Sequence, residues 1–334
     1  MEKLIENFGV QLTDAISIGE KIEFTEELRS FSNVVIAGMG GSGIGGTIVS
    51  ELVMEESKVP IVVSKNYFLP EFVSEKTLVI VSSYSGNTEE TVNALNEGVE
   101  KGAKVVCIAS GGKVIEIAKE KKLNYIKIPD TVIAEGVSSP RAAIGYSLIQ
   151  LFFVLNFFNV ISDEWKNDME SAISLIESER ENIKKEASVV AEKIFGKFPI
   201  VYAPEGSLGI AIRFKQQLNE NSKMLSWYNV IPEMNHNELL GWEGGTDNLG
   251  VVIFRNHADY VRTAQRIEFS KQEILKHTPN IVEIYSKGGS AIERAIYHIH
   301  LGDYVSIYLA SLRKVNPNNL DVIEELKGAL AKSQ

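Results

Sequence analysis

Short apolar runs rich in β-branched residues alternate with helical patterns in the first third of the chain, and this alternation limits the possible folds more than any other feature of the sequence. The runs lie at residues Asn33–Gly38, Pro60–Val63, Thr77–Ser82 and Lys104–Ser110. Their apolar residues are largely continuous, which is typical of strands buried on both faces. Strands that alternate with helices predict an α/β fold, in which helices cover both faces of a parallel sheet.

The second half of the sequence repeats the pattern of the first half. Residues Val105–Lys113 and Ile281–Ser290 each contain a strand pattern, a serine, paired glycines and the start of a helical pattern. Residues Val34–Ser42 resemble Ile200–Ser207 in the same way. Because 334 residues are too many for one typical hydrophobic core, two tandem copies of one α/β unit are the expected organisation.

These patterns predict the domain boundaries. We expect a first domain over residues 1–160, a bridging helix over 161–195 and a second domain over 196–334. The bridge is predicted because Asp163–Lys193 is charged and amphipathic along its length. Arg141–Asn159 is also expected to form a long helix.

A turn crowded with hydroxyl groups follows the third apolar run, over Ser82–Thr88. A helical pattern starts directly after it, and the first N–H groups of a helix lack partners and favour an anion. Ser83, Ser85 and Thr88 would add hydroxyl donors to those groups. A single hydroxyl would be enough for an ordinary helix cap, with Asn87 or Thr88 as the capping residue. Three hydroxyls in six residues instead favour a phosphate-binding site.

The second copy lacks this turn. Its strand Leu249–Phe254 corresponds to Thr77–Ser82, but the residues that follow it, Arg255–Asp259, do not form a hydroxyl cluster. We therefore expect one phosphate site per chain, on the first copy.

Charge and composition disfavour several classes of function. The net charge is −10 and there is no run of Lys or Arg, which argues against a nucleic-acid groove or a membrane-surface role. Cys107 is the only cysteine, so an intrachain disulfide and a cysteine-based metal cluster are excluded, and its place in a strand pattern predicts a core residue rather than a nucleophile. There is no signal-peptide pattern, and the longest apolar stretch, Leu148–Ile161, is too short to span a bilayer. These features predict a cytoplasmic protein.

A G-x-G-x-x-G pattern raises the alternative of dinucleotide binding. It consists of Gly38, Gly40 and Gly43, and its last two glycines lie in an expected glycine-rich turn over Met39–Gly46. The next strand is followed by Ser-Lys rather than by an acidic residue that would bind a ribose. Glycines that let the backbone approach a bound sugar closely agree better with the hydroxyl turn, so we predict no cofactor.

The glycine-rich stretch Gly40–Gly43 together with the hydroxyl turn resembles the sugar isomerase (SIS) domain. Two such domains in one chain of this length resemble the bifunctional phosphoglucose/phosphomannose isomerase family of archaea and bacteria. The resemblance extends from about Val34 to Lys327. It includes three further stretches, namely Ser139–Arg141, Asn219–Lys223 and Pro232–Glu238.

The resemblance implies a metal-independent isomerase that acts on glucose 6-phosphate and fructose 6-phosphate, and also on mannose 6-phosphate. Aldose–ketose isomerisation needs a base between C1 and C2, a donor near the enediolate oxygens and an acid/base pair that opens the ring. By resemblance, Glu220 is the base and Arg141 stabilises the enediolate. His236 and Lys327 would open the ring. The residues implied to bind the phosphate are Gly41, Ser42, Ser83, Ser85 and Thr88.

The resemblance also implies a homodimer in which His236 is lent across the interface. One position departs from the family pattern. The family carries a hydroxyl or amide side chain before the last helix, linked to the use of mannose phosphate, whereas this chain has Leu320 there. Use of mannose 6-phosphate therefore depends on whether Asn318 or Asn319 takes over that role.

Two alternatives remain open. The first is a non-catalytic regulator that binds a sugar phosphate, although residues 1–30 are too short and too acidic for a DNA-binding helix-turn-helix. The second is an amino-sugar phosphate isomerase or deaminase, although no glutamine-hydrolysing domain is evident. Ammonia release from glucosamine 6-phosphate would distinguish the second alternative.

Overall fold

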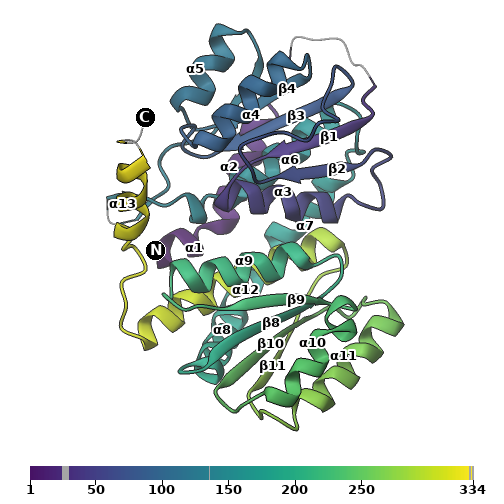
Figure 1. Ribbon diagram of the computed structural model, residues 1–334, viewed down its shortest axis with the longest axis vertical. Coiled ribbons are helices and arrows are strands. Elements are labelled where there is room, and N and C mark those ends of the chain that lie inside the picture. The colour runs from purple at the N-terminus through teal and green to yellow at the C-terminus, as the bar shows by residue number, and fades with distance from the viewer. Residues whose placement is uncertain (25–29, 135, 331, 333–334) are drawn as a thin grey trace.

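The computed structural model describes residues 1–24, 30–134, 136–330 and 332 of the chain. This part of the chain forms two parallel sheets, one above the other along the long axis of the molecule, with helices on the faces of each (Figure 1). The predicted α/β fold with two tandem parallel-sheet units is therefore confirmed.

The first sheet has the strand order β2-β1-β3-β4-β5, and every neighbouring pair is parallel. The four predicted strands form within one residue of their expected ends, and β5 is an addition. Its strands are β1 (Asn33–Ala37), β2 (Ile61–Ser64), β3 (Thr77–Ser83), β4 (Lys104–Ala109) and β5 (Asn124–Lys127). Its helices include α3 (Gly40–Leu52), α4 (Glu89–Glu100), α5 (Gly112–Glu120) and α6 (Ile144–Phe157).

The second sheet has the order β11-β10-β8-β9, again with parallel neighbours. This order matches β4-β3-β1-β2 strand for strand, so the predicted internal repeat is confirmed. The strands are β8 (Phe198–Pro204), β9 (Trp227–Ile231), β10 (Leu249–Arg255) and β11 (Ile281–Tyr285). The helices after them are α9 (Leu208–Glu220), η2 (Glu233–His236), α10 (Glu238–Gly241), η3 (Trp242–Gly244), α11 (Val261–Ile274) and α12 (Ala291–Leu312).

The remaining elements lie outside the two sheets. They are α1 (Glu2–Glu6), α2 (Phe8–Gly19), the hairpin β6 (Ile133–Ala134) and β7 (Val137–Ser138), η1 (Pro140–Ala142), α7 (Trp165–Ser178), α8 (Arg180–Ile194) and α13 (Asp321–Leu330).

Three local predictions were wrong. The expected turn over Met39–Gly46 is mostly helix, because α3 starts at Gly40, whose φ of +49° turns the chain directly from strand into helix. The predicted bridging helix is two helices, α7 and α8, separated at Glu179, and both pack against α12. Arg141 lies in the 3₁₀ turn η1, ahead of α6, rather than at the start of a long helix.

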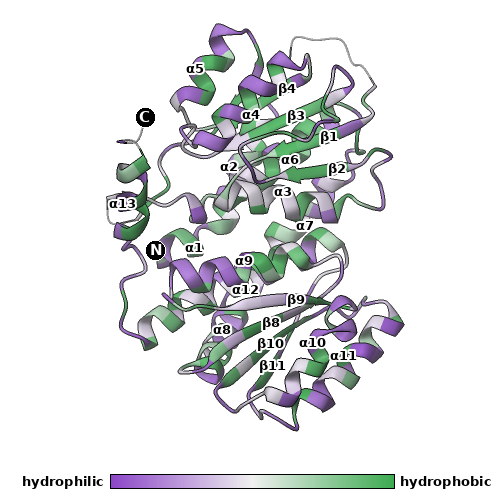
Figure 2. Ribbon diagram, in the orientation of Figure 1, coloured by the Kyte–Doolittle hydropathy of each residue, from purple (hydrophilic) through white to green (hydrophobic). Residues whose placement is uncertain are grey.

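One hydrophobic cluster joins the two sheets. It includes Ile36 of β1, Phe152 of α6, Phe214 of α9 and Phe254 of β10. Figure 2 shows the same pattern, with apolar strands and an apolar α6 inside a more polar exterior. A shared core fixes the two halves relative to each other.

Two further predictions concern the burial of Cys107 and the length of the apolar helices. Cys107 is fully buried in β4, and burial raises the pKa of its thiol to about 12, so it is a core residue as predicted. Within the described residues, no helix combines the length and apolarity that a bilayer span requires.

His298 and His300 are both buried on α12 and face different neighbours. The His298 ring lies 4.9 Å from the ring of Phe254 in the second sheet. The His300 ring stacks at 5.6 Å on Phe8 of α2. Burial lowers the pKa of each imidazole from 6.5 to about 3, so both are neutral in the folded protein.

The two histidines predict a loss of stability in acid. The unfolded chain binds protons on both rings below pH 6.5, whereas the folded chain resists them down to about pH 3. Stability should therefore fall as the pH drops through this window, with each ring adding up to about 1.4 kcal/mol per pH unit. Urea unfolding between pH 7 and pH 4 measures the slope.

A His298→Gln or His300→Gln variant should show a shallower slope than the wild type, because it has one buried imidazole fewer. The carboxylates that also titrate are common to both proteins. His257→Gln, the same substitution at an exposed histidine, is the matched control. Equal slopes in all variants would contradict the prediction.

Candidate active site

The start of α3 and the end of α9 lie together, because these two helices pack antiparallel between the sheets. At one end of the pair, the Glu51 carboxylate accepts hydrogen bonds from the N–H groups of Leu208 and Gly209, at 2.9 and 2.7 Å. At the other end, a Cβ on Gly41 would lie 3.3 Å from the carbonyl oxygen of Pro140. The arrangement brings the glycine-rich start of α3 next to η1 and to the last residue of α9.

The hydroxyl turn is not an ordinary helix cap. Thr88 is the N-cap residue of α4, yet its side chain makes no capping hydrogen bond in the described structure. Instead, the buried Ser83 hydroxyl donates to Thr88 Oγ1 at 3.2 Å, and Ser85 Oγ accepts from the N–H of Asn87 at 3.3 Å. The turn therefore does not form the simple helix cap that was the alternative to a phosphate site.

The shape of the turn depends on Gly86. Its φ is +69°, and a Cβ at this position would lie 1.8 Å from the carbonyl oxygen of Gly111. Both conditions require glycine, which lets the turn lie directly against the loop after β4.

Ser42 joins the hydroxyl turn to the start of α3. Its Oγ accepts a hydrogen bond from the N–H of Tyr84 at 3.2 Å. The beginnings of α3 and α4 thus meet at the carboxyl ends of β1 and β3, where ligands bind in open parallel sheets. The predicted phosphate-binding residues that gather here are Gly41, Ser42, Ser83, Ser85 and Thr88.

Arg141 is buried beside this point, with a side-chain exposure of 3%. Its Nε donates to Asn221 Oδ1 at 2.8 Å and its Nη2 donates to the carbonyl oxygen of Pro317 at 2.8 Å. Burial lowers the pKa of the guanidinium group, and the charge of Glu220 opposes that shift. Arginine remains charged in either case, so it presents a fixed cation next to Glu220.

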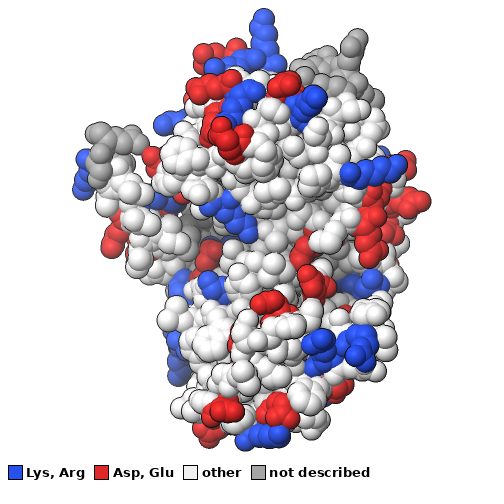
Figure 3. Space-filling model, turned by 45° about the vertical axis from the view of Figure 1, so that its right-hand side comes forward, with Lys and Arg blue, Asp and Glu red and all other residues white. Residues whose placement is uncertain are grey.

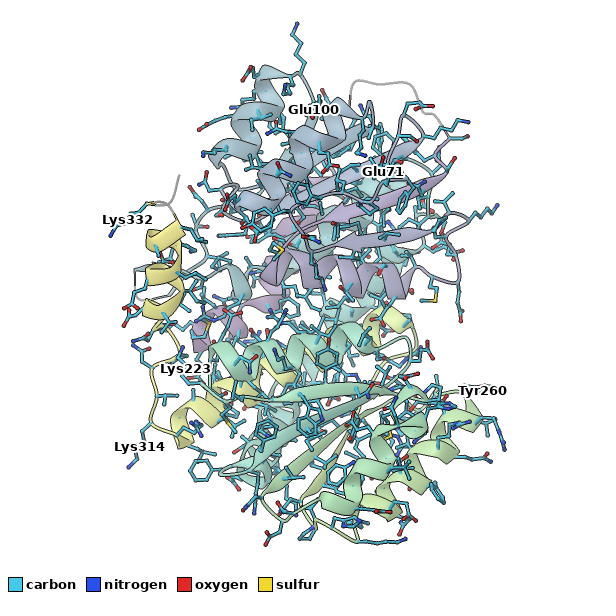
Figure 4. All side chains as sticks on the ribbon, in the orientation of Figure 1. Glu71, Glu100, Lys223, Tyr260, Lys314 and Lys332 are labelled. Atoms are coloured by element: carbon cyan, nitrogen blue, oxygen red, sulfur yellow. The ribbon has the colours of Figure 1, made fainter. Side chains whose placement is uncertain are left out.

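Glu220 is the last residue of α9, and its side chain is about one-third exposed. Its Oε2 lies 4.0 Å from Arg141 Nη1. The neighbouring Lys223 donates from Nζ to the carbonyl oxygens of Glu220 and Asn319, at 2.6 Å each. Figure 4 shows Lys223 close to the segment that leads into α13.

His236 lies away from Glu220 in the same chain. It ends η2, which follows β9, and the last residue of β9, Ile231, pairs with Pro204 near the start of α9. Glu220 lies at the other end of α9, and a 13-residue helix is roughly 18 Å long. His236 is exposed, so a single chain does not assemble it with the carboxylate.

Lys327 also lies apart from Glu220 and Arg141. It lies on α13, every residue of which is exposed, and its Nζ pairs with Glu324 Oε1 at 2.7 Å. The structure thus brings together seven of the predicted site residues and leaves His236 and Lys327 outside.

The equivalent position in the second copy differs in charge. A cavity of about 260 Å³ lies there, lined partly by Glu51, Glu205 and Asp259. The Glu51 carboxylate already occupies the N–H groups at the start of α9, and burial raises the pKa of that carboxyl group. A carboxylate at this helix start disfavours a second anion, which agrees with the expectation of one phosphate site per chain.

Sequence reasoning missed the buried groups beneath Arg141. Asn221 lies within Asn219–Lys223, one of the stretches that carry the family resemblance. No local pattern marks Arg213 and Asp303, which pair at 2.8 Å with side-chain exposures of 2% and 7%. Charged residues in amphipathic helices are normally on the surface, so only the packing reveals them.

Among the described residues, no cluster of three or more His, Cys, Asp or Glu side chains is suitable for a metal ion. Figure 3 shows acidic and basic side chains interspersed over one face of the molecule.

Two protein families match the chain. The SIS domain matches residues 27–140, and the bacterial phospho-glucose isomerase C-terminal SIS domain matches residues 183–330. The bifunctional phosphoglucose/phosphomannose isomerase of Caldicellulosiruptor bescii is 37% identical, over 99% of this chain and 99% of the relative. The chain belongs to the bifunctional phosphoglucose/phosphomannose isomerase family. The resemblance inferred from the motifs is therefore confirmed.

Two further matches indicate the breadth of the family and of the fold. A D-glucosamine-6-phosphate 4-epimerase of Sulfolobus acidocaldarius is 31% identical, over 90% of each chain. The C-terminal domain of glucosamine-fructose-6-phosphate aminotransferase from Francisella tularensis has a TM-score of 0.79 at 14% identity, over 96% of this chain and 98% of that one. The latter match shows a shared fold.

Proposed function

We propose that this isomerase interconverts glucose 6-phosphate and fructose 6-phosphate, and also converts mannose 6-phosphate, without a metal ion. The observation that supports the proposal is the 4.0 Å approach of Glu220 to Arg141, whose backbone lies against Gly41 at the start of α3, one residue before the Ser42 that bonds to the hydroxyl turn. A carboxylate, a fixed cation and an anion-binding turn are the groups that aldose–ketose isomerisation needs. Membership of the family supports the same substrates. The single cysteine and the metabolic substrates support the cytoplasm as its location.

The phosphate is the group that positions the substrate. Ser42, Ser83, Ser85 and Thr88 offer hydroxyl donors, and the N–H groups at the start of α4 add their dipole. Gly41 lets η1 approach the start of α3 closely, because a Cβ there would lie 3.3 Å from the Pro140 carbonyl oxygen. Binding through neutral donors explains how an anion is held by a chain of net charge −10.

Glu220 then moves the proton. It removes the proton from C2 of the open-chain aldose, and the electron pair of that C–H bond becomes the C1–C2 double bond. The carbonyl oxygen becomes an enediolate oxygen, which the guanidinium of Arg141 stabilises. Return of the proton to C1, with transfer of the O2 proton to O1, gives the ketose.

Ring opening requires groups that a single chain does not supply. We propose a homodimer in which His236 of one chain reaches the site of the other, because His236 and Glu220 lie at opposite ends of α9. Lys327 would act with it after α13 moves toward the site. The four apolar side chains of α13 that are exposed in the chain alone support such a docking, namely Val322, Ile323, Leu326 and Leu330.

Use of mannose 6-phosphate rests on the segment before α13. Pro317 touches Arg141 through its carbonyl oxygen, so this segment borders the site. Asn318, the next residue, is buried with an Oδ1 that has no partner among the described residues. We propose that its amide replaces the polar side chain missing at Leu320.

One observation favours a second candidate function. The epimerase of Sulfolobus acidocaldarius belongs among the relatives, so an amino-sugar phosphate is a reasonable alternative substrate. A non-catalytic regulator is less well supported, because it would not need a carboxylate and an arginine beside the phosphate turn.

A coupled assay with glucose, mannose and glucosamine 6-phosphates tests the proposal. We expect turnover of the first two sugars to fructose 6-phosphate, unchanged by EDTA. Ammonia release from the third would instead favour a deaminase. A thermal shift with sugar phosphate but no turnover of any sugar would favour the regulator.

A further inference from the structure

Two hydrogen-bond acceptors fix the Arg141 guanidinium on the side that faces away from the Glu220 carboxylate. Its Nε donates to Asn221 and its Nη2 donates to the Pro317 carbonyl. Nη1 faces Glu220 at 4.0 Å, which is too long for a direct hydrogen bond. The N–H groups of Nη1 are therefore the ones that can meet a ligand oxygen next to the base.

Asn221 is itself fixed at both ends of its amide. It is fully buried, its Oδ1 accepts from Arg141, and its Nδ2 donates to Ser306 Oγ at 2.9 Å. Ser306 Oγ donates in turn to the carbonyl oxygen of Asp303 at 2.6 Å. A flipped amide would place a donor against Nε and lose both bonds, so only one orientation is stable.

The backbone of Arg141 is held by the same pair of helices. Arg213 Nη2 donates to the Arg141 carbonyl oxygen at 2.7 Å and to Asp303 Oδ2 at 2.8 Å. Gln217 donates to the other oxygen of that carboxylate, also at 2.8 Å. Arg213 and Gln217 of α9 and Asn221, which directly follows the helix with helical backbone angles, are four residues apart, so they share the face that packs on α12.

We propose that Asn221 is a positioning residue, which aims the Arg141 guanidinium at the enediolate oxygens. This role rests on the proposed isomerase activity. Asn221 directly follows Glu220 in the sequence, so the base and the group that orients the cation are carried by the same turn of α9. The buried Arg213–Asp303 ion pair fixes the Arg141 backbone through its carbonyl oxygen.

A double-mutant cycle tests the role of Asn221. Asn221→Ala should lower kcat about 10- to 100-fold while KM changes little, because the phosphate contacts lie on the other domain. In an Arg141→Ala background the same change should cost almost nothing more, because its target is already absent. Asn221→Asp, which keeps an oxygen for Nε, should retain more turnover than Asn221→Ala.

Ser222→Ala is the matched control. Ser222 is also fully buried and bonds to the Ser306 carbonyl oxygen at 2.6 Å, but shares no hydrogen bond with Arg141 among the described residues. It should lower the melting temperature without a selective loss of kcat.

The outcomes separate this proposal from the activity on which it rests. A wild type without isomerase turnover would refute the proposed function. An active wild type in which Asn221→Ala costs the same factor with and without Arg141 would refute the positioning role. If Asn221→Ala does not fold, a kcat for Asn221→Asp no higher than that of Arg141→Ala would refute it as well.

Discussion

Replacing Glu220 with glutamine should reduce kcat by about 10²- to 10⁴-fold, which is the contribution expected of a positioned general base. The amide keeps the size of the side chain but cannot accept the proton from C2. The Arg141 guanidinium and the hydroxyl turn remain, so sugar phosphate should still bind. Coupled assays give kcat, and exchange of the C2 hydrogen with solvent deuterium reports on the proton transfer itself.

Glu55→Gln is the matched control for this substitution. Glu55 lies just beyond the end of α3, the helix that corresponds to α9 in the first copy, and is exposed, so its replacement should leave kcat and exchange unchanged. Wild-type turnover by a folded Glu220→Gln protein would remove Glu220 from the mechanism. Loss of binding together with turnover would point to a role in holding the substrate instead.

Mixing two inactive variants should restore activity if His236 acts across a dimer interface. In a dimer of one Glu220→Gln chain and one His236→Ala chain, one site carries both substitutions and the other carries neither. Random exchange of subunits makes half of the dimers mixed, so about a quarter of the wild-type activity should return. Activity measured before and after exchange in mild urea gives the result.

The controls for the mixing experiment are the two variants alone, taken through the same exchange. Neither should recover. If His236 serves the site of its own chain, mixed dimers contain no intact site and no activity returns. Sedimentation of the wild type as a monomer would overturn the dimer directly.

The strands and the repeat were predictable because their signals are local. Continuous β-branched runs mark strands buried on both faces, and the same strand–serine–glycine order recurs in both halves. The start of α3 was not predicted, because glycines favour turns in isolation. Only its packing on β1, where a Cβ on Gly46 would lie 2.8 Å from Ile36 Cγ2, explains glycines inside a helix.

The sequence by itself determined the α/β repeat, the hydroxyl turn after β3 and, through its motifs, the family. Tertiary structure alone decided which of these groups meet. The antiparallel packing of α3 and α9 brings Glu220 within 4.0 Å of Arg141 from the first half of the chain, and places His236 at the far end of the same helix. The hydrogen-bond partners of Arg141 come from α9, from Asn221 directly after it and from the segment before α13. Contacts between residues so distant in sequence leave no local periodicity, so only the packed fold reveals them.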